Sequence, residues 1–114
     1  MDVQANLPLT ETTFFIMLSL ASEPKHGYAI MKEVETLSRG NVQLRTGTLY
    51  GAIKRLLGGG WIERVGEEDK GKDQSRGRKS YQLTNLGRRV LEAEMMRLDS
   101  LVTVAHEALG GVEA

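Results

Sequence analysis

The stretch TGTLYGAIKRLLGGG, from Thr46 to Gly60, decides the fold that we expect for this chain. With Thr46 as N-cap, a helix over residues 46–58 turns about 100° per residue and places its apolar side chains on one arc. That arc consists of Leu49, Ala52, Ile53, Leu56 and Leu57. The opposite face consists of Gly47, Gly51, Lys54 and Gly58, flanked by Thr48, Tyr50 and Arg55. Glycine costs a helix about 1 kcal/mol relative to alanine, so we expect this bare face to allow close approach of a partner.

Two more helices precede this stretch. The first spans about residues 10–22, from the N-cap Thr10 to the break at Pro24. Its apolar side chains point all around it, so it must be buried on every side, which a chain of 114 residues can hardly achieve alone. We therefore expect a second subunit to cover part of it. The residues expected at that contact are Phe14, Phe15, Met17 and Leu18. The second helix spans about residues 26–38 and stops at Gly40.

Two short strands follow the glycine triplet that ends the third helix. Residues 61–65 and 80–83 each alternate between apolar and polar side chains, and the polar stretch 66–79 joins them. The pattern predicts a β-hairpin over residues 61–83 with a mobile tip. We expect Trp61, the only tryptophan, to anchor this hairpin to the core.

The last predicted helix runs from its N-cap Thr84 to a stop at Gly110. Apolar residues recur along it with the seven-residue spacing of a coiled-coil seam, over about three repeats. They are Leu91, Met95, Leu98, Val102, Ala105 and Leu109. The seam can pack on the chain's own first helix or on a partner subunit, and we expect it to do both. Residues 84–114 are therefore interpreted as a dimerisation element that follows a domain of residues 1–83.

Composition excludes several classes of protein. The absence of cysteine excludes a disulfide scaffold, a thiolate zinc site and a cysteine nucleophile. His26 and His106 are the only histidines and have no evident nucleophile or metal-ligand companion, so we expect neither an enzyme nor a metal or cofactor site. The longest apolar run, residues 14–18, is far too short for a membrane span, and no signal-peptide pattern opens the chain. We expect no membrane partner and a cytoplasmic location.

Charge is balanced over the whole chain but unevenly distributed. Twelve Lys or Arg residues and five Asp or Glu residues lie between Arg39 and Arg89. The two flanks together carry three basic and ten acidic residues. The basic centre favours a polyanionic partner, and the acidic ends disfavour indiscriminate coating of nucleic acid. An ordinary solvated surface with uneven charge is the alternative.

The predicted order is three helices, a hairpin and a long helix, which is a mainly α fold with a small β-hairpin. It corresponds to a winged helix-turn-helix with a C-terminal dimerisation helix, in which the hairpin is the wing. Four blocks in this order resemble the PadR family of bacterial transcriptional regulators, from about Leu9 to about Leu98. They read TETTFFIMLSL, HGYAIMKEV, GTLYGAIKRLLGGGWIE and RKSYQLTNLGRRVL. The single helix after the wing is similar to the shorter PadR subfamily.

The resemblance implies a homodimer that binds double-stranded operator DNA of inverted-repeat character, mostly as a repressor, and that in many members is released by a small molecule. The block that opens the second helix, where backbone N–H groups can meet a phosphate, contains His26, Gly27 and Tyr28. The block that opens the recognition helix contains Gly47, Thr48, Leu49 and Tyr50, with Lys54 and Arg55 further along.

Individual side chains then have expected roles and alternatives. Thr48 and Tyr50 are expected to approach bases or the sugar-phosphate backbone, and Lys54 to neutralise a phosphate or read a guanine edge. Tyr50 can equally be a rim residue under the wing, and Arg55 a salt-bridge partner on the helix surface. Wing contacts to the backbone or minor groove are expected from Arg76, Arg78 and Lys79.

A small hydrophobic or aromatic effector is the least defined partner. In some multidrug-sensing PadR-like proteins an aromatic residue of the C-terminal helix stacks on planar drugs, whereas the corresponding stretch here reads AEMMRLDSL. Met95 and Met96 can line an adaptable pocket or simply fill the core. A winged-helix module that binds another protein through the same surface is the alternative to a DNA-binding regulator.

Overall fold

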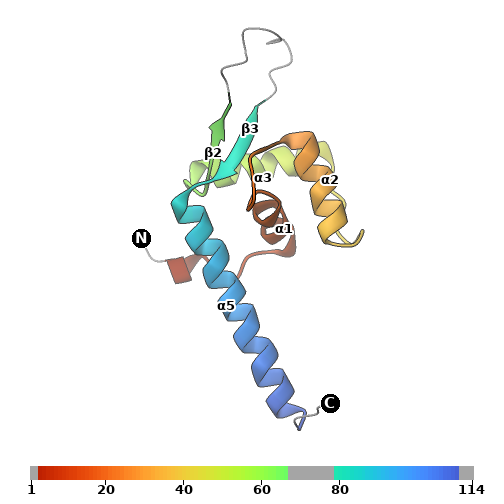
Figure 1. Ribbon diagram of the computed structural model, residues 1–114, viewed down its shortest axis with the longest axis vertical. Coiled ribbons are helices and arrows are strands. Elements are labelled where there is room, and N and C mark those ends of the chain that lie inside the picture. Colours follow the sequence, from red (N-terminus) through yellow and green to blue (C-terminus); the bar gives the residue numbers. More distant parts are fainter. Residues whose placement is uncertain (1–2, 67–78, 111–114) are drawn as a thin grey trace.

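The structure is a computed structural model that describes residues 3–66 and 79–110. It is mainly α-helical with one small antiparallel sheet, which confirms the fold class predicted from the sequence (Figure 1). The elements are η1 (Val3–Asn6), α1 (Glu11–Ser19), β1 (Lys25–His26), α2 (Gly27–Leu37), α3 (Thr46–Gly58), β2 (Ile62–Val65), β3 (Ser80–Leu83) and α5 (Asn85–Ala108). In this order α2 and α3 form the helix-turn-helix, and β2 and β3 form the base of the wing.

Two predicted N-caps are confirmed. The side-chain oxygen of Thr10 accepts a hydrogen bond from the backbone N–H of Thr13 at the start of α1. The side-chain oxygen of Thr84 accepts the corresponding bond from Gly87 at the start of α5. Each bond satisfies a backbone donor that has no partner within its helix.

Three predicted boundaries are wrong by one to three residues. Thr46 is the first residue of α3 rather than its N-cap. Arg45 is the N-cap, and its side chain makes no capping hydrogen bond. The start of α3 is exposed, so solvent can satisfy its first N–H groups. α1 ends at Ser19 because the chain tightens into a turn there, with the N–H of Leu20 bonded to the carbonyl of Met17. α5 ends at Ala108.

The sheet contains a third strand that the sequence analysis missed. Its strands are ordered β1-β3-β2, and β1 pairs Lys25 with Tyr81 and His26 with Ser80. Two residues are too few for an alternating pattern, so nothing in the sequence indicates this strand. His26, predicted as the first residue of the second helix, lies in β1 and is the N-cap of α2. The start of α2 is therefore fixed directly to the wing.

The hydrophobic core forms around α1, which packs against α2 and α5 (Figure 1). Ile16 and Met17 are completely buried by the chain's own elements, whereas Phe14, Phe15 and Leu18 remain half-buried. The chain thus covers α1 more fully than we expected. Met17 and Leu91, both predicted at the dimer interface, lie inside the protomer core, and we exclude them from that interface because no partner can reach them.

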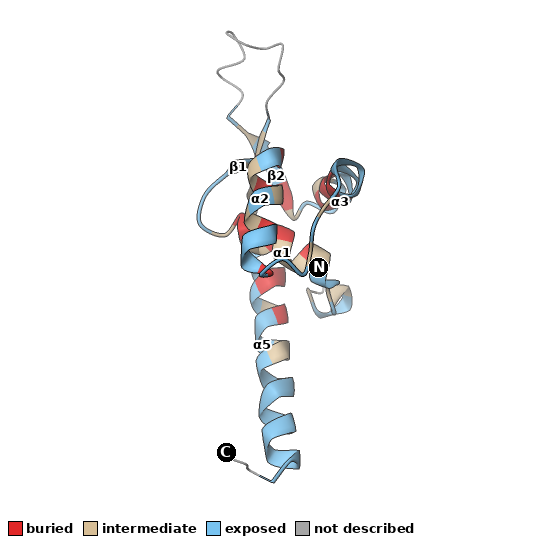
Figure 2. Ribbon diagram, turned by 90° about the vertical axis from the view of Figure 1, so that its right-hand side faces the viewer, coloured by how far each residue is buried: buried red, intermediate tan, exposed pale blue. Residues whose placement is uncertain are grey.

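The first half of α5 belongs to the domain and the second half extends away from it (Figure 2). Arg88 donates to the backbone carbonyl of Ala21 and the buried Glu94 accepts from the N–H of Leu9, so α5 is attached near both ends of α1. From Asp99 onward every described residue of the helix is exposed. Within the described part of the chain, no helix combines the length and apolar character needed to cross a bilayer.

Candidate nucleic-acid interface

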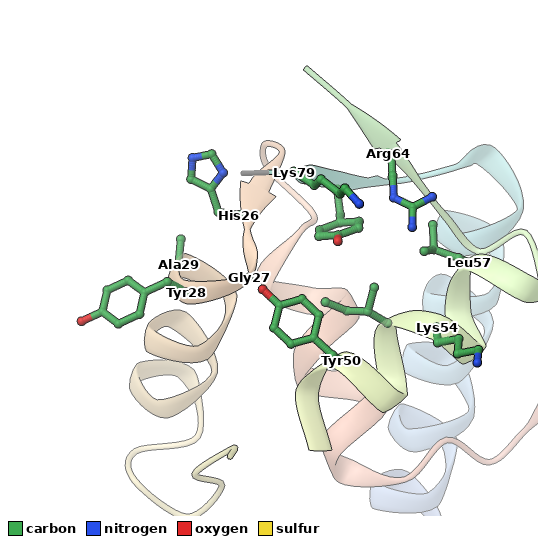
Figure 3. Close-up of a pocket in the computed structure, with 11 residues that line it drawn as sticks. His26, Gly27, Tyr28, Ala29, Tyr50, Lys54, Leu57, Arg64 and Lys79 are labelled. Atoms are coloured by element: carbon green, nitrogen blue, oxygen red, sulfur yellow. The ribbon is translucent and has the colours of Figure 1, made fainter. Parts of the chain in front are cut away.

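A groove of about 680 Å³ lies between the start of α2, the middle of α3 and the sheet (Figure 3). Three cationic side chains line it: Lys54 of α3, Arg64 of β2, and Lys79, the residue before β3. No acidic residue is among the described residues that line it. The other lining residues are His26, Gly27, Tyr28, Ala29, Tyr50, Ile53, Leu57 and Tyr81. The basic residues from the centre of the sequence therefore form a basic surface at this groove.

The exposed face of α3 has the character predicted from the sequence. The opposite face of α3 is buried and consists of Leu49, Ala52, Ile53 and Leu56. Gly47, Gly51 and Gly58 are exposed, and nothing lies within 4 Å of a Cβ added at any of them. Thr48 and Lys54 are exposed beside these glycines. Gly59 and Gly60 follow Gly58 at the end of α3. Gly59 is the C-cap, and Gly60 has a φ of 77°.

Tyr50 lies at the edge of this face and packs against the start of α2. A Cβ added at Gly27 would overlap the Tyr50 hydroxyl, so Gly27 is required for this close approach. Tyr50 remains 45% exposed and lines the groove (Figure 3). Its ring therefore has the rim position that we considered as an alternative, while its free side still faces the groove.

Arg64 and Tyr81 are groove residues that the sequence analysis did not identify. They are directly paired across β2 and β3, so their side chains are on the same side of the sheet. Burial raises the pKa of Tyr81, and the neighbouring Tyr50 adds to this, while a hydrogen bond from Arg64 and its charge act in the opposite direction. Alternation in the sequence placed both residues in strands, but only the register shows that they face each other.

The start of α2 contributes a second set of predicted residues. His26 is exposed, and its Nδ1 lies 3.2 Å from the hydroxyl of Ser80 on β3. Tyr28 is 70% exposed, with the ammonium of Lys32 at 5.8 Å from its ring centroid. Gly27 is buried between them. The structure thus brings the HGY block next to the recognition helix.

The remaining residues predicted to contact DNA do not all lie at the groove. Arg55 does not line the groove, because it is one residue, or about 100°, around the helix from Lys54. It lines a separate hollow of about 370 Å³ together with Trp61 and the N-terminal segment. Lys79 is exposed at the groove. Arg76 and Arg78 lie outside the described residues.

Metal-binding and effector sites have little basis in this structure. Among residues 3–66 and 79–110, no three His, Asp or Glu side chains gather where they could hold a metal ion. Met95 and Met96 are 49% and 71% exposed on α5, so neither fills the core of the protomer. Neither of them lines the two hollows described above.

Comparison with known proteins places this geometry in a family. The model of the transcriptional regulator PadR-like family matches residues 16–93, from α1 to the middle of α5. The chain belongs to this family. This PadR-like protein is therefore a DNA-binding transcriptional regulator and not an enzyme. A search of the curated proteins gave no match.

Solved structures agree with the family. A PadR family transcription regulator from hypervirulent Clostridium difficile R20291 is 30% identical to this PadR-like protein, with a TM-score of 0.66 over 89% of this chain and 100% of that one. A PadR-like transcription factor from Bacteroides fragilis is 25% identical, with a TM-score of 0.68 over 85% and 88% of the two chains. A transcriptional regulator from Clostridium thermocellum, 23% identical, shares the fold at a TM-score of 0.66, over 83% and 89%.

Proposed function

We propose that this PadR-like protein is a homodimeric repressor that binds an inverted-repeat operator through the groove and the exposed face of α3. The convergence of Lys54, Arg64 and Lys79 on one hollow carries this proposal. Phosphate oxygens are the ligands that such a group of cations attracts. No carboxylate of the described residues pairs with these cations, so their charge is available to DNA.

The shape of α3 supports insertion into the major groove. A major groove about 12 Å wide admits one α-helix. The open positions at Gly47 and Gly51 let the backbone of α3 sit deep, with Thr48 and Lys54 beside it to reach base edges or phosphates. In this orientation the groove and Lys79 follow the DNA backbone next to α3, and the predicted wing residues Arg76 and Arg78 extend the contact.

A homodimer is supported by the exposed half of α5. Large apolar side chains there have no cover within the protomer; Leu101, Val102, Val104 and Leu109 are each more than half exposed. The proposed interface retains Phe14, Phe15 and Leu18 on α1, and Met95, Leu98, Val102, Ala105 and Leu109 along α5. A two-fold axis through this contact would repeat α3 once, and a symmetric pair of recognition helices reads an inverted repeat.

Repression and its release are the finer parts of the proposal. A dimer bound over a promoter excludes other proteins from the same DNA, and the family resemblance favours this outcome. A small hydrophobic effector would act at the dimer contact, where the flexible thioether of Met95 is part of the seam and that of Met96 lies beside it. Because the proposed repressor acts on genomic DNA, we also predict a cytoplasmic location.

The decisive experiment measures binding to DNA. Fluorescence anisotropy with the duplex upstream of the protein's own gene, at two salt concentrations, should show specific binding with a Kd of about 10⁻⁸ M or tighter that weakens steeply with salt. Lys54→Ala should weaken it on the order of tenfold. Absence of any specific, salt-sensitive binding, to this duplex or to one selected from random-sequence DNA, would refute the proposal. A protein partner that is lost on Lys54→Ala while DNA behaviour is unchanged would favour the protein-interaction alternative.

A further inference from the structure

Arg64 differs from the other cations of the groove because a buried side chain lies directly opposite it. The register of β2 and β3 pairs Arg64 with Tyr81. Tyr81 is only 4% exposed, whereas Arg64 is exposed and lines the groove (Figure 3). Burial of the ring restricts where its hydroxyl can lie, and the register and the shared groove place Arg64 beside it, where a hydrogen bond from Arg64 lowers the pKa of Tyr81.

The surroundings of Arg64 leave the rest of its charge unneutralised. Glu63, the nearest acidic neighbour in sequence, is on the other side of the strand and accepts a hydrogen bond of 2.6 Å from Gln82. Among the described residues, no carboxylate pairs with Arg64. A neutral hydroxyl can orient a guanidinium without satisfying its five donors. The other donors of Arg64 are therefore available to an anion that enters the groove.

We infer that Arg64 binds one backbone phosphate of the operator at the junction of α3 and the wing, and that Tyr81 is the positioning residue that holds the guanidinium there. This inference rests on the proposed function, because it requires α3 to be docked on DNA. Guanidinium groups match phosphate oxygens through two parallel hydrogen bonds. A guanidinium that is already oriented binds such an oxygen pair without first losing its rotamer freedom.

Tyr50 completes this arrangement from the side of α3. It is an electrostatic neighbour of Tyr81 and packs on Gly27. Tyr50 from α3, Tyr81 from β3 and Arg64 from β2 therefore all line the same groove. The phosphate bound by Arg64 would fix the spacing between the recognition helix and the wing.

A double-mutant cycle tests the inference on the full-length protein, with a duplex selected from random-sequence DNA as the probe. Arg64→Gln should weaken binding on the order of tenfold and lower the slope of log K against log salt by about 0.9, the value for one phosphate. Tyr81→Phe keeps the aromatic ring and leaves the positive charge of Arg64 in place, so it should weaken DNA binding about threefold and leave the salt slope unchanged. In the Arg64→Gln background, Tyr81→Phe should then have no further effect.

Four outcomes overturn the inference. Equal effects of Tyr81→Phe in both backgrounds would show that the hydroxyl acts through the fold and not through Arg64. A slope that Arg64→Gln leaves unchanged would show that this side chain meets no phosphate. If Lys54→Ala weakens DNA binding while Arg64→Gln does not, the inference about Arg64 fails and the proposed function stands. If the unmodified protein selects no DNA, the inference and the proposed function both fail. Arg89→Gln, on the exposed surface of α5 outside the groove, is the matched control and should leave affinity and slope unchanged.

Discussion

Gly51 leaves a bare position on the exposed face of α3. It lies in the interior of α3, where glycine weakens a helix, yet nothing within 4 Å would hinder a side chain there. Packing therefore does not explain the glycine. Under the proposed function, close approach of the α3 backbone to DNA would explain it, because a side chain at this position would hold the helix away from the floor of the major groove.

Gly51→Leu separates folding from DNA binding. We expect the substitution to raise the free energy of unfolding by up to about 1 kcal/mol, since leucine is the better helix former. Operator affinity should fall by about tenfold or more. Urea unfolding and fluorescence anisotropy measure the two effects. Thr36→Leu on the exposed end of α2 is the control and should leave affinity unchanged; unchanged affinity for Gly51→Leu would mean that this face does not enter the major groove.

Glu94 is the buried charged residue of α5, and its carboxylate is satisfied from two directions. It accepts hydrogen bonds of 2.6 and 2.9 Å from Arg97 and one of 3.1 Å from the N–H of Leu9. The hydrogen bond from Arg97 lowers the pKa of Glu94 despite the opposing effect of burial, and the bond from Leu9 adds to the lowering. The ionised form is therefore the one that stabilises the fold.

The lowered pKa of Glu94 predicts loss of stability in acid. Its contribution is fully present above the ordinary value of 4.5 and is lost as the pH falls from there through the lower pKa of the folded state. Glu94→Gln should cost about 2 kcal/mol at pH 7 and much less at pH 3. Urea unfolding at both values, at one protein concentration, measures the difference. An equal cost at pH 7 and pH 3 would show that the carboxylate charge is not what stabilises this contact.

At the scale of elements, the junction of α5 with β2 depends on a contact between backbones. A Cβ added at Gly87 would overlap the carbonyl oxygen of Trp61, which already accepts a hydrogen bond from the N–H of Thr84. Thr84 also donates its hydroxyl to the carbonyl of Gly60 at 2.6 Å. The end of α3, the first residue of the hairpin and the start of α5 are therefore joined within a few residues.

Gly87→Ala should disturb this junction. Backbone atoms cannot move aside as a flexible side chain can, so we expect the free energy of unfolding to fall by about 2 kcal/mol. Gly58→Ala is the matched control, because an added methyl group there meets open space, and it should be neutral or stabilising. Urea unfolding of the two variants provides the comparison. Equal stability of the two would contradict the close contact at Trp61.

Prediction of these elements from sequence succeeded where local patterns suffice. The capping side chains of Thr10 and Thr84, the helical arc beneath α3 and the alternation in β2 and β3 all act over a few residues. β1 was missed because its two residues have no pattern of their own and form a strand only beside β3. Gly87 was missed for a similar reason, since its neighbour Trp61 belongs to another element.

At the scale of the whole molecule, the exposed half of α5 is the part that the proposed dimer would bury. It extends from the body on the side opposite β2 and β3 (Figure 1). Its large apolar side chains are exposed in the single chain. A second copy would cover them and would place two α3 helices on one face of the dimer or on its two ends. The crossing angle of the two α5 helices would then set the spacing of the operator half-sites.

Val102→Glu should dissociate the dimer. Val102 is 52% exposed on the predicted seam, and the partner would bury a charge placed there among apolar side chains, which costs free energy. Sedimentation should show a dimer for the unmodified protein and a monomer for the variant, whose operator affinity should fall about a hundredfold with the loss of bivalent binding. Ser100→Glu is the control, since it lies about 200° around the helix from Leu98. A folded monomer of the unmodified protein at micromolar concentration would contradict this interface.

The sequence by itself determined the four long helices, the two wing strands and the location of the basic region, because capping, periodicity and charge are properties of neighbouring residues. It also placed Lys54 and the bare glycines on one helix face. Only the tertiary structure decided which side chains meet: Arg64 opposite Tyr81, Gly27 against Tyr50, and Met17 and Leu91 inside the core instead of at a partner's surface. These contacts join residues far apart in the chain, and their distances depend on how the elements pack.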